Sequence, residues 1–158
     1  MTASKIRDTA ALAEECRGWR REGTRIAFAN GCFDLLHVGH VRYLAGARAL
    51  GDVLVVAVNG DASVRRLKGE GRPLMPLDER LEILSHLDVV DRLVVFDEPT
   101  CAELLLLLQP HVQVKGTDYT PDSIPEAEVV RSYGGTTAVA GDPKNHSTSD
   151  LLSKMRRP

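Results

Sequence analysis

The chain has 158 residues, 43% of them hydrophobic and 27% charged, so its length and composition are those of one globular domain with one hydrophobic core. A net charge of −2 and an aromatic content of 4% disfavour nucleic-acid binding. Three cysteines that are far apart in the sequence (Cys16, Cys32, Cys101) disfavour disulfides and structural zinc. The apolar runs are well below the ~20 residues that cross a bilayer, which disfavours membrane insertion. With no apolar stretch of a signal peptide at the N-terminus, these features predict a cytoplasmic protein.

Apolar runs separated by glycine and proline predict helices and strands in alternation along the chain. An amphipathic helix comes first and ends near Gly23. Strands are predicted at residues 25–29, 53–58, 92–96, 112–116 and 136–140. Helices are predicted at residues 9–22, 40–50, 61–67, 77–87, 101–108, 126–133 and 147–155.

This alternation predicts an α/β fold with a single five-stranded, mostly parallel sheet and helices on both faces. Residues 53–58, VLVVAV, are apolar without alternation, as in a parallel strand buried on both sides. We interpret residues 1–158 as one domain, in which residues 1–23 contribute a helix that packs on the core.

Polar segments follow four of the predicted strands. They read NGCFDLLHVGH after the first strand, NGDASVRRLKG after the second, KGTDY after the fourth and GDPKNHSTSD after the fifth. Ligands of open α/β sheets bind at the carboxyl ends of the strands, so these segments predict a site at that edge.

His37 and His40 flank Gly39 where the first strand leads into a helix. One interpretation is a metal site with Cys32 as a third ligand, and another is a pair of capping or core histidines. The favoured interpretation is an anion site, because a helix N-terminus offers unpaired N–H groups and partial positive charge, to which imidazole adds donors.

A second anion site is predicted at the run Ser147, Thr148 and Ser149, which opens the last helix, although one of these hydroxyls can be explained by capping alone. Lys68 lies in a glycine-punctuated loop that can close over a ligand. Arg80 is either part of the site or an ordinary surface ion pair with Asp78 or Glu82.

Two residues after the fourth strand complete the candidates. Lys115 follows a buried strand directly, and Asp118 can accept ribose hydroxyls, although aspartate after glycine is also common in turns. The chain contains no GxGxxG, GxxxxGK[ST] or GxSxG pattern, which disfavours hydride transfer, P-loop chemistry and α/β-hydrolase activity.

Two segments together carry a family resemblance. GCFDLLHVGH resembles the HxGH signature of the cytidylyltransferase-like nucleotidyltransferases, and STS resembles their second signature at the last helix. The segments from NGCFD to GEGRP, with ERLEIL and VKGTDY, are similar to the adenylyltransferase domain of ADP-heptose synthases. The resemblance runs from about Gly23 onward and implies a Rossmann-like fold without the partner kinase domain.

The resemblance implies that His37 and His40 contact the NTP phosphates and stabilise charge at the α-phosphorus, with Lys68 reaching over those phosphates. Further implied nucleotide- and phosphate-binding residues are Asn30, Gly31, Cys32, Phe33, Gly39, Lys115, Gly116, Asp118, Ser147, Thr148 and Ser149. The implied acceptor-binding residues are Asp34, Asn59 and Arg80. Mg²⁺ is the expected cofactor, held mainly through the triphosphate rather than by a cluster of side chains.

Three departures from the family pattern leave the nucleobase and the acceptor open. Thr117 stands where KGGDY has its second glycine, His146 precedes the serine, and no arginine precedes HSTS, where Lys144 can supply a cation instead.

The expected partners are an NTP, with ATP favoured and CTP possible, and a phosphorylated small-molecule acceptor. A homodimer is expected, with no nucleic acid and no membrane. The favoured reaction joins ATP and heptose 1-phosphate to give ADP-heptose and pyrophosphate. Two alternatives stay open: a CTP-dependent cytidylyltransferase acting on a small phosphate or phosphonate, and a nucleotide-binding sensor that has lost catalysis.

Overall fold

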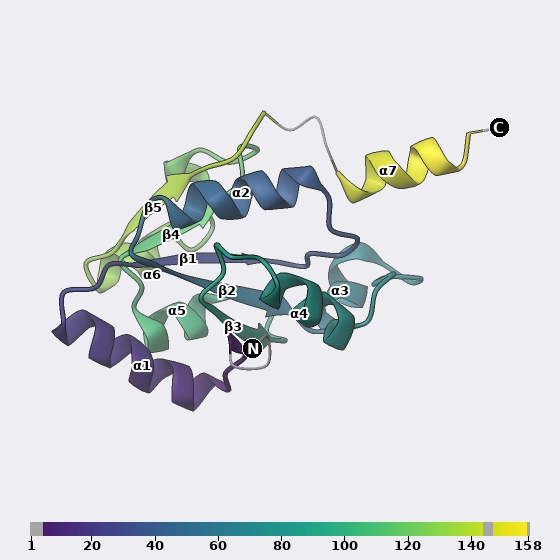
Figure 1. The fold of residues 1–158 in the computed structure, drawn as a ribbon. Coiled ribbons are helices and arrows are strands. Elements are labelled where there is room, and N and C mark those ends of the chain that lie inside the picture. The colour runs from purple at the N-terminus through teal and green to yellow at the C-terminus, as the bar shows by residue number, and fades with distance from the viewer. Residues whose placement is uncertain (1–4, 144–146, 158) are drawn as a thin grey trace.

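Five parallel strands form one sheet in the order β3-β2-β1-β4-β5 in the computed structural model, which describes residues 5–143 and 147–157 (Figure 1). The strands are β1 (Ile26–Gly31), β2 (Val53–Asn59), β3 (Arg92–Phe96), β4 (Val112–Lys115) and β5 (Thr136–Val139). Every pairing is parallel, so the predicted sheet is confirmed and contains no antiparallel strand among these five. The strand order reverses beside β1, and such a reversal opens a crevice at the carboxyl edge.

The predicted helices are also present, with ends that shift by a residue or two. They are α1 (Thr9–Arg21), α2 (Val38–Arg48), α3 (Asp61–Lys68), α4 (Leu77–Ser85), α5 (Ala102–Leu108), α6 (Ala127–Ser132) and α7 (Thr148–Met155). A short 3-10 helix, η2 (Pro121–Ser123), was not predicted. The helix α2 begins earlier than predicted because the side chain of His37 accepts a hydrogen bond from the Gly39 N–H and caps it.

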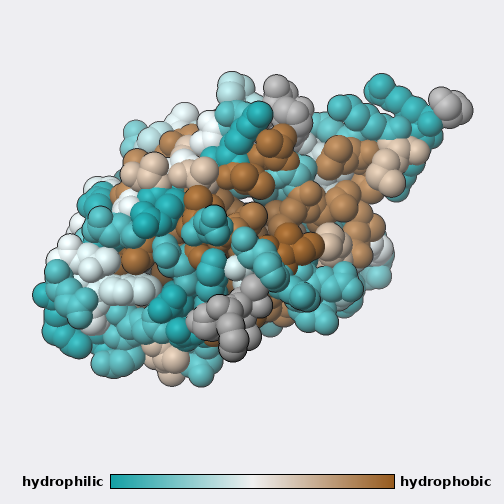
Figure 2. Space-filling model, viewed as in Figure 1, coloured by the Kyte–Doolittle hydropathy of each residue, from teal (hydrophilic) through white to brown (hydrophobic). Residues whose placement is uncertain are grey.

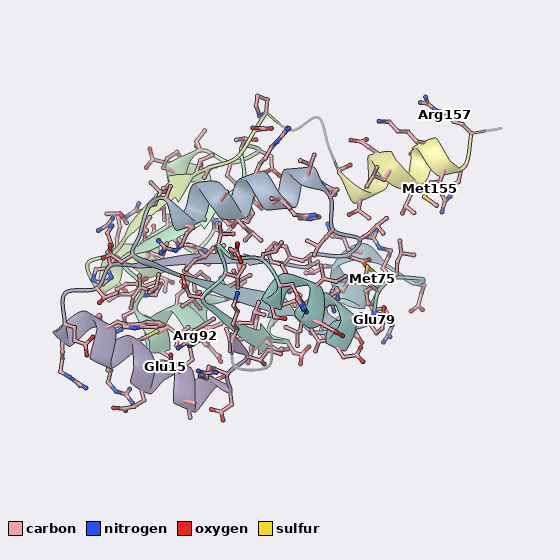
Figure 3. The ribbon with its side chains drawn as sticks, in the orientation of Figure 1. Glu15, Met75, Glu79, Arg92, Met155 and Arg157 are labelled. Carbon is pink, nitrogen blue, oxygen red and sulfur yellow. The ribbon has the colours of Figure 1, made fainter. Side chains whose placement is uncertain are left out.

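The sheet separates two hydrophobic clusters, as expected for a sheet that is covered on both faces. One cluster joins α1, α5 and α6 to one face, and the other joins α2 and α4 to the opposite face (Figure 1). The helix α1 contributes Leu12, Ala13 and Cys16 to the first cluster. Its Glu15 accepts a hydrogen bond from the Arg92 Nε of β3 at 2.7 Å, which ties α1 to the sheet edge (Figure 3).

The helix α7 stands apart from this layered body. It extends away from the sheet in Figure 1, and none of its side chains is buried. Figure 2 shows apolar surface gathered between α2, α4 and α7 on this side of the molecule, where several large apolar side chains are exposed. Large apolar side chains that are exposed on the described molecule as a whole include Val38, Val41, Leu67, Leu74 and Met155. The core therefore forms without α7, which is held mainly at its start.

None of the helices in residues 5–143 and 147–157 combines the length and the apolar character needed to cross a bilayer.

Candidate active site

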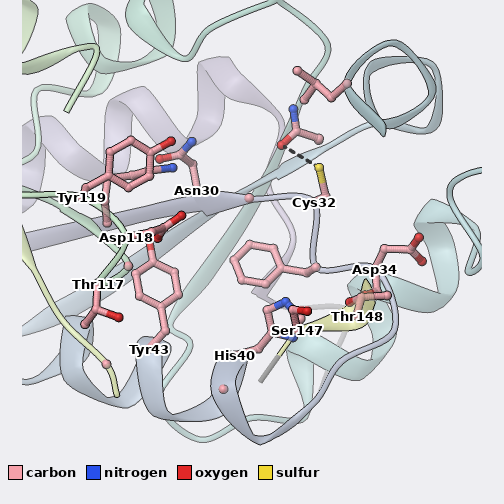
Figure 4. Close-up of a pocket in the computed structure, with 18 of the residues that line it drawn as sticks. Asn30, Cys32, Asp34, His40, Tyr43, Thr117, Asp118, Tyr119, Ser147 and Thr148 are labelled. Atoms are coloured by element: carbon pink, nitrogen blue, oxygen red, sulfur yellow. Dashed lines mark hydrogen bonds between the residues drawn. The ribbon is translucent and has the colours of Figure 1, made fainter. Parts of the chain in front are cut away.

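A cavity of about 650 Å³ opens at the carboxyl edge of the sheet and extends to the start of α7 (Figure 4). It is lined by nearly all of the residues that the sequence predicts for the site. These are Asn30, Gly31, Cys32, Phe33, Asp34, His37, Gly39, His40, Asn59, Lys68, Lys115, Gly116, Asp118, Ser147, Thr148 and Ser149. Arg80 is the predicted site residue that does not line it.

The loop between β1 and α2 has a strained backbone that the rest of the structure holds in place. Phe33 and Leu35 both adopt positive φ, at 51° and 52°, a region that non-glycine residues rarely occupy. Strain of this kind persists where surrounding contacts fix it, and it gathers at functional sites. The contacts here come from the residue between them, Asp34.

The Asp34 carboxylate is buried and fully engaged by a distant loop. It accepts hydrogen bonds from Arg72 Nε at 2.7 Å, the Leu74 N–H at 2.8 Å and the Met75 N–H at 3.0 Å. Burial raises the pKa of this carboxyl, but the bonds from Leu74, Arg72 and Met75 outweigh burial, so the net pKa lies below its ordinary value.

Asp34 lines the cavity, and acceptor binding by it stays a prediction, but the structure shows a second role for this side chain. Its side chain is 1% exposed and its oxygens already accept three hydrogen bonds. A carboxylate so enclosed would also repel a phosphate. Through these bonds, Asp34 fixes the loop around residues 72–75 to the loop between β1 and α2.

Arg80 departs from its prediction. The side chain is fully buried in α4, so it is neither a surface ion pair with Asp78 or Glu82 nor a cavity-lining group. Its guanidinium donates to the carbonyls of Met75, Cys32 and Asn59 and to the Asp61 carboxylate, at 2.6–3.0 Å. Because Cys32 directly follows β1 and Asn59 ends β2, Arg80 joins the carboxyl ends of these two strands.

The two histidines cap α2, and the capping hydrogen bonds determine which nitrogen of each ring carries the proton. His37 Nδ1 accepts the Gly39 N–H, and His40 Nδ1 accepts the His37 N–H, both at 3.1 Å. The capping interpretation is therefore correct as far as it goes. A ring nitrogen that accepts a hydrogen bond carries no proton, so each neutral ring has its N–H at Nε2.

The histidine rings lie together beside the cavity. Their centroids are 3.9 Å apart, and His40 also approaches the Phe33 ring at 5.6 Å (Figure 4). The metal interpretation finds no support, because no three His, Cys, Asp or Glu side chains come together as a metal site in the portion of the chain that the structure describes. Two imidazole N–H donors at the start of a helix are suited to phosphate oxygens.

The start of α7 forms another wall of the cavity. Ser147 caps the helix by accepting the Asp150 N–H at 3.0 Å, which leaves its hydroxyl hydrogen to donate elsewhere. Thr148 Oγ1 donates to the Asp34 carbonyl at 2.6 Å. This bond joins α7 to the strained loop, and phosphate binding by Thr148, which also lines the cavity, stays a prediction.

The segment after β4 closes the remaining side. Lys115 Nζ lies 5.2 Å from the centroid of the Tyr119 ring, and Asp118 is exposed at the rim. The departure at Thr117 has a structural consequence, because its hydroxyl donates to the Asp142 carbonyl at 2.5 Å and ties this loop to the segment that leads towards α7. Lys144 and His146, noted in the sequence, lie outside the described residues.

Sequence reasoning missed several polar or aromatic residues that line the cavity, among them Tyr43, Arg72, Tyr119 and Glu126. The signal for Arg72 was present, since it lies in the glycine- and proline-rich loop that was predicted to cover the ligand. No local pattern pointed to Glu126, which is the N-cap residue of α6 and accepts hydrogen bonds from Cys101 and Gln113.

Comparison with known proteins gives a consistent result. The family described as Cytidylyltransferase-like matches residues 28–154. "Bifunctional protein HldE" of Geotalea uraniireducens is 51% identical over 153 residues, which cover 97% of this chain and 31% of that protein. The protein of the same name from Ectopseudomonas mendocina is 50% identical over 137 residues, or 87% of this chain and 29% of that protein. The chain thus spans about a third of the length of these relatives.

Two solved structures share the architecture. The lipopolysaccharide core biosynthesis protein from Thermoplasma volcanium superposes with a TM-score of 0.66 at 28% identity, over 77% of this chain and 99% of that one. Pantoate-beta-alanine ligase from Francisella tularensis, in complex with beta-gamma ATP and beta-alanine, gives a TM-score of 0.61 at 16% identity, over 91% of this chain and 68% of that one. The second likeness concerns the Rossmann-like fold alone.

Proposed function

The chain belongs to the cytidylyltransferase-like family, and from this premise we propose that it transfers a nucleoside monophosphate from an NTP to the phosphate of a small acceptor. An acceptor phosphate oxygen attacks the α-phosphorus in line, a new P–O bond forms, and the bond to the leaving pyrophosphate breaks. No covalent intermediate with the protein forms. Phosphoryl chemistry of this kind depends on positioning and charge stabilisation rather than on a nucleophilic side chain.

One observation carries the proposal. The N-termini of α2 and α7 border the same cavity, and two histidines with Nε2–H donors stand at the first of them. The helix α2 with His37 and His40 would hold the α-phosphate, while Ser147 and the first N–H groups of α7 would hold the β- and γ-phosphates. Orienting two bound reactants can contribute about 7–11 kcal/mol towards the barrier.

Mg²⁺ would accompany the triphosphate. The described residues offer it no carboxylate cluster, and the Asp34 carboxylate is already occupied by three donors. This fits a cation that prefers phosphate oxygens and retained waters to a cage of protein ligands. When bound, the ion would neutralise charge on the leaving pyrophosphate.

Within this reaction class we favour ATP and heptose 1-phosphate, with ADP-heptose as the product. Support comes from the resemblance of NGCFD, ERLEIL and VKGTDY to the adenylyltransferase domain of ADP-heptose synthases, and from the relatives that share half of their aligned residues with this chain. CTP with another small phosphate or phosphonate is the alternative, because the segment before Ser147 departs from the family pattern.

The test is pyrophosphate release from the purified protein with Mg²⁺, across a panel of NTPs crossed with sugar 1-phosphates, polyol phosphates and phosphonates. The favoured outcome is release with ATP and heptose 1-phosphate that needs both substrates. Release with CTP and a different acceptor would replace the substrates and keep the reaction. Tight NTP binding without release for any pair would overturn the enzyme and favour the sensor.

We also propose a homodimer, supported by the apolar side chains of Val38, Val41, Leu67 and Leu74, which are 42–56% exposed. Sedimentation equilibrium over a range of concentrations tests it. A single species at the mass of one chain at all concentrations would exclude the dimer.

A further inference from the structure

We propose that Arg72 is a phosphate-binding residue of this site, presented to the cavity by Asp34. The inference rests on the proposed function, because it names the group that would hold one of the reaction's phosphates. It takes the acceptor-binding role that the sequence had suggested for Asp34 and assigns it to the arginine that Asp34 holds.

The placement of Arg72 is the first step. Its side chain is only 16% exposed, yet it lines the main cavity together with Cys32 and Lys68. It also lines a smaller hollow of about 340 Å³, formed with residues of α3 and of the loop before α4. The guanidinium therefore lies between the cavity and the loop that covers its edge.

The hydrogen bonds of Arg72 give the second step. Nε donates to Asp34 Oδ2 at 2.7 Å, while neither terminal nitrogen has a hydrogen-bond acceptor among residues 5–143 and 147–157. Asp34 also accepts two backbone N–H groups from the same loop, which fixes the orientation of its carboxylate. An arginine held at Nε keeps its two terminal nitrogens as a planar fork, which matches a phosphate in a bidentate geometry.

Local charge gives the third step. Lys68 and Arg72 are two cations against the single carboxylate of Asp34, and the net charge at this end of the cavity is therefore positive. Since most of the Arg72 side chain is already buried, little side-chain entropy remains to be lost on binding. A phosphate there would be either the phosphate of the acceptor, which we favour, or a phosphate of the nucleotide.

The experiment compares Arg72→Ala and Arg72→Lys with wild type, using steady-state kinetics on the substrate pair that the panel finds. Because hydrogen bonds to charged groups are worth about 1.5–3 kcal/mol, Arg72→Ala should raise the KM of one substrate about tenfold to a hundredfold. Arg72→Lys should recover part of this loss, since it restores the charge without the fork. A rise in the KM of the acceptor identifies the acceptor phosphate, and a rise in the KM of the NTP identifies the nucleotide.

Arg65→Ala is the matched control, because Arg65 is an exposed arginine that lines the smaller hollow and not the main cavity. It should leave both KM values unchanged. If Arg72→Ala lowers kcat or the urea midpoint while both KM values stay within about twofold of wild type, Arg72 is a structural latch and the proposal is overturned. Binding of inorganic phosphate, followed by calorimetry, gives an arm that does not depend on turnover: weaker binding to Arg72→Ala supports the assignment, and equal binding contradicts it.

The kinetic measurements and the phosphate-binding measurement together distinguish a failure of this inference from a failure of the proposed function. If wild type shows no transfer with any substrate pair, the function fails, while the phosphate-binding arm still decides the role of Arg72.

Discussion

At the scale of single residues, His37 and His40 cap α2 with one ring nitrogen, and in the proposed reaction the other nitrogen would bind phosphate. Nδ1 of each ring accepts a backbone N–H at 3.1 Å, and the proton is thereby placed on Nε2. Capping and ligand binding are therefore not competing interpretations of this motif. The cap sets the tautomer, and the tautomer supplies the donor.

The two roles of His40 can be separated by substitution. In His40→Asn, the amide oxygen can replace Nδ1 as the acceptor of the His37 N–H, but the Nε2–H donor is lost. We expect turnover to fall about 10²–10³-fold, as for other removed donors to a developing charge, with little change in the urea midpoint. His40→Ala should lose the same turnover and, in addition, about 0.5–2 kcal/mol of stability with the cap. Near-normal turnover in His40→Asn would refute a role for Nε2–H.

Cys32 allows the cavity to be probed chemically. Burial raises the pKa of its thiol above the ordinary value, and the nearby cations Lys68 and Arg80 only partly oppose that effect. The thiol is therefore protonated at neutral pH and reacts slowly with iodoacetamide. The midpoint of the rise in rate with pH should lie above about 8.5, the ordinary pKa of a cysteine thiol, and a bound NTP should slow the reaction.

Mass spectrometry of labelled protein at successive times measures this rate at each cysteine. Cys16 serves as the internal control, because it is buried away from the cavity and burial raises its pKa to about 11. Labelling of Cys32 that levels off below about pH 8 would mean that the cations outweigh burial.

At the scale of secondary-structure elements, local sequence patterns were enough to place the strands and helices. They could not predict hydrogen bonds between residues that are far apart in the chain. The segment 53–58 read as a buried parallel strand because its side chains are uniformly apolar, and β2 lies there. The bond of Arg72 to Asp34 spans 38 residues, and that of Thr148 to Asp34 spans 114. Sequence patterns report a residue's neighbours along the chain, so they brought Asp34, Arg80 and Thr148 to the site without revealing their partners.

The brace formed by Arg80 predicts a large loss of stability. In Arg80→Leu, the carbonyls of Cys32, Asn59 and Met75 lose their donor inside the protein, and a buried unpaired group costs about 1–3 kcal/mol. We expect the free energy of unfolding to fall by about 3 kcal/mol or more, measured by urea denaturation. Asp61→Asn is the control, because the Asp61 side chain is 43% exposed and asparagine keeps an oxygen that can accept the Arg80 N–H, so its loss should be smaller than that of Arg80→Leu. Equal losses in the two variants would place the stabilisation in the ion pair instead.

At the scale of the whole molecule, the site is assembled from a body that folds around its sheet and a helix that attaches to it late in the chain. The N-terminus of α2 belongs to the body, while α7 buries no side chain and is joined to the strained loop by the Thr148 hydroxyl. Stability and triphosphate binding should therefore depend on different parts of the chain. A variant that ends at Pro143 separates them.

Without α7 the body should unfold within about 1–2 kcal/mol of the full chain, because α7 buries no side chain and the hydrogen bonds of the Thr148 hydroxyl are lost with it. NTP affinity should fall at least about tenfold, since Ser147 and the N–H groups of the helix start are removed. Met155→Gln is the control, because Met155 is 76% exposed at the far end of α7 and should affect neither quantity. Urea denaturation and calorimetry measure the two effects. A truncated chain that binds NTP as tightly as the full one would show that α7 is no part of the phosphate site, and one that no longer unfolds cooperatively would show that α7 completes the core.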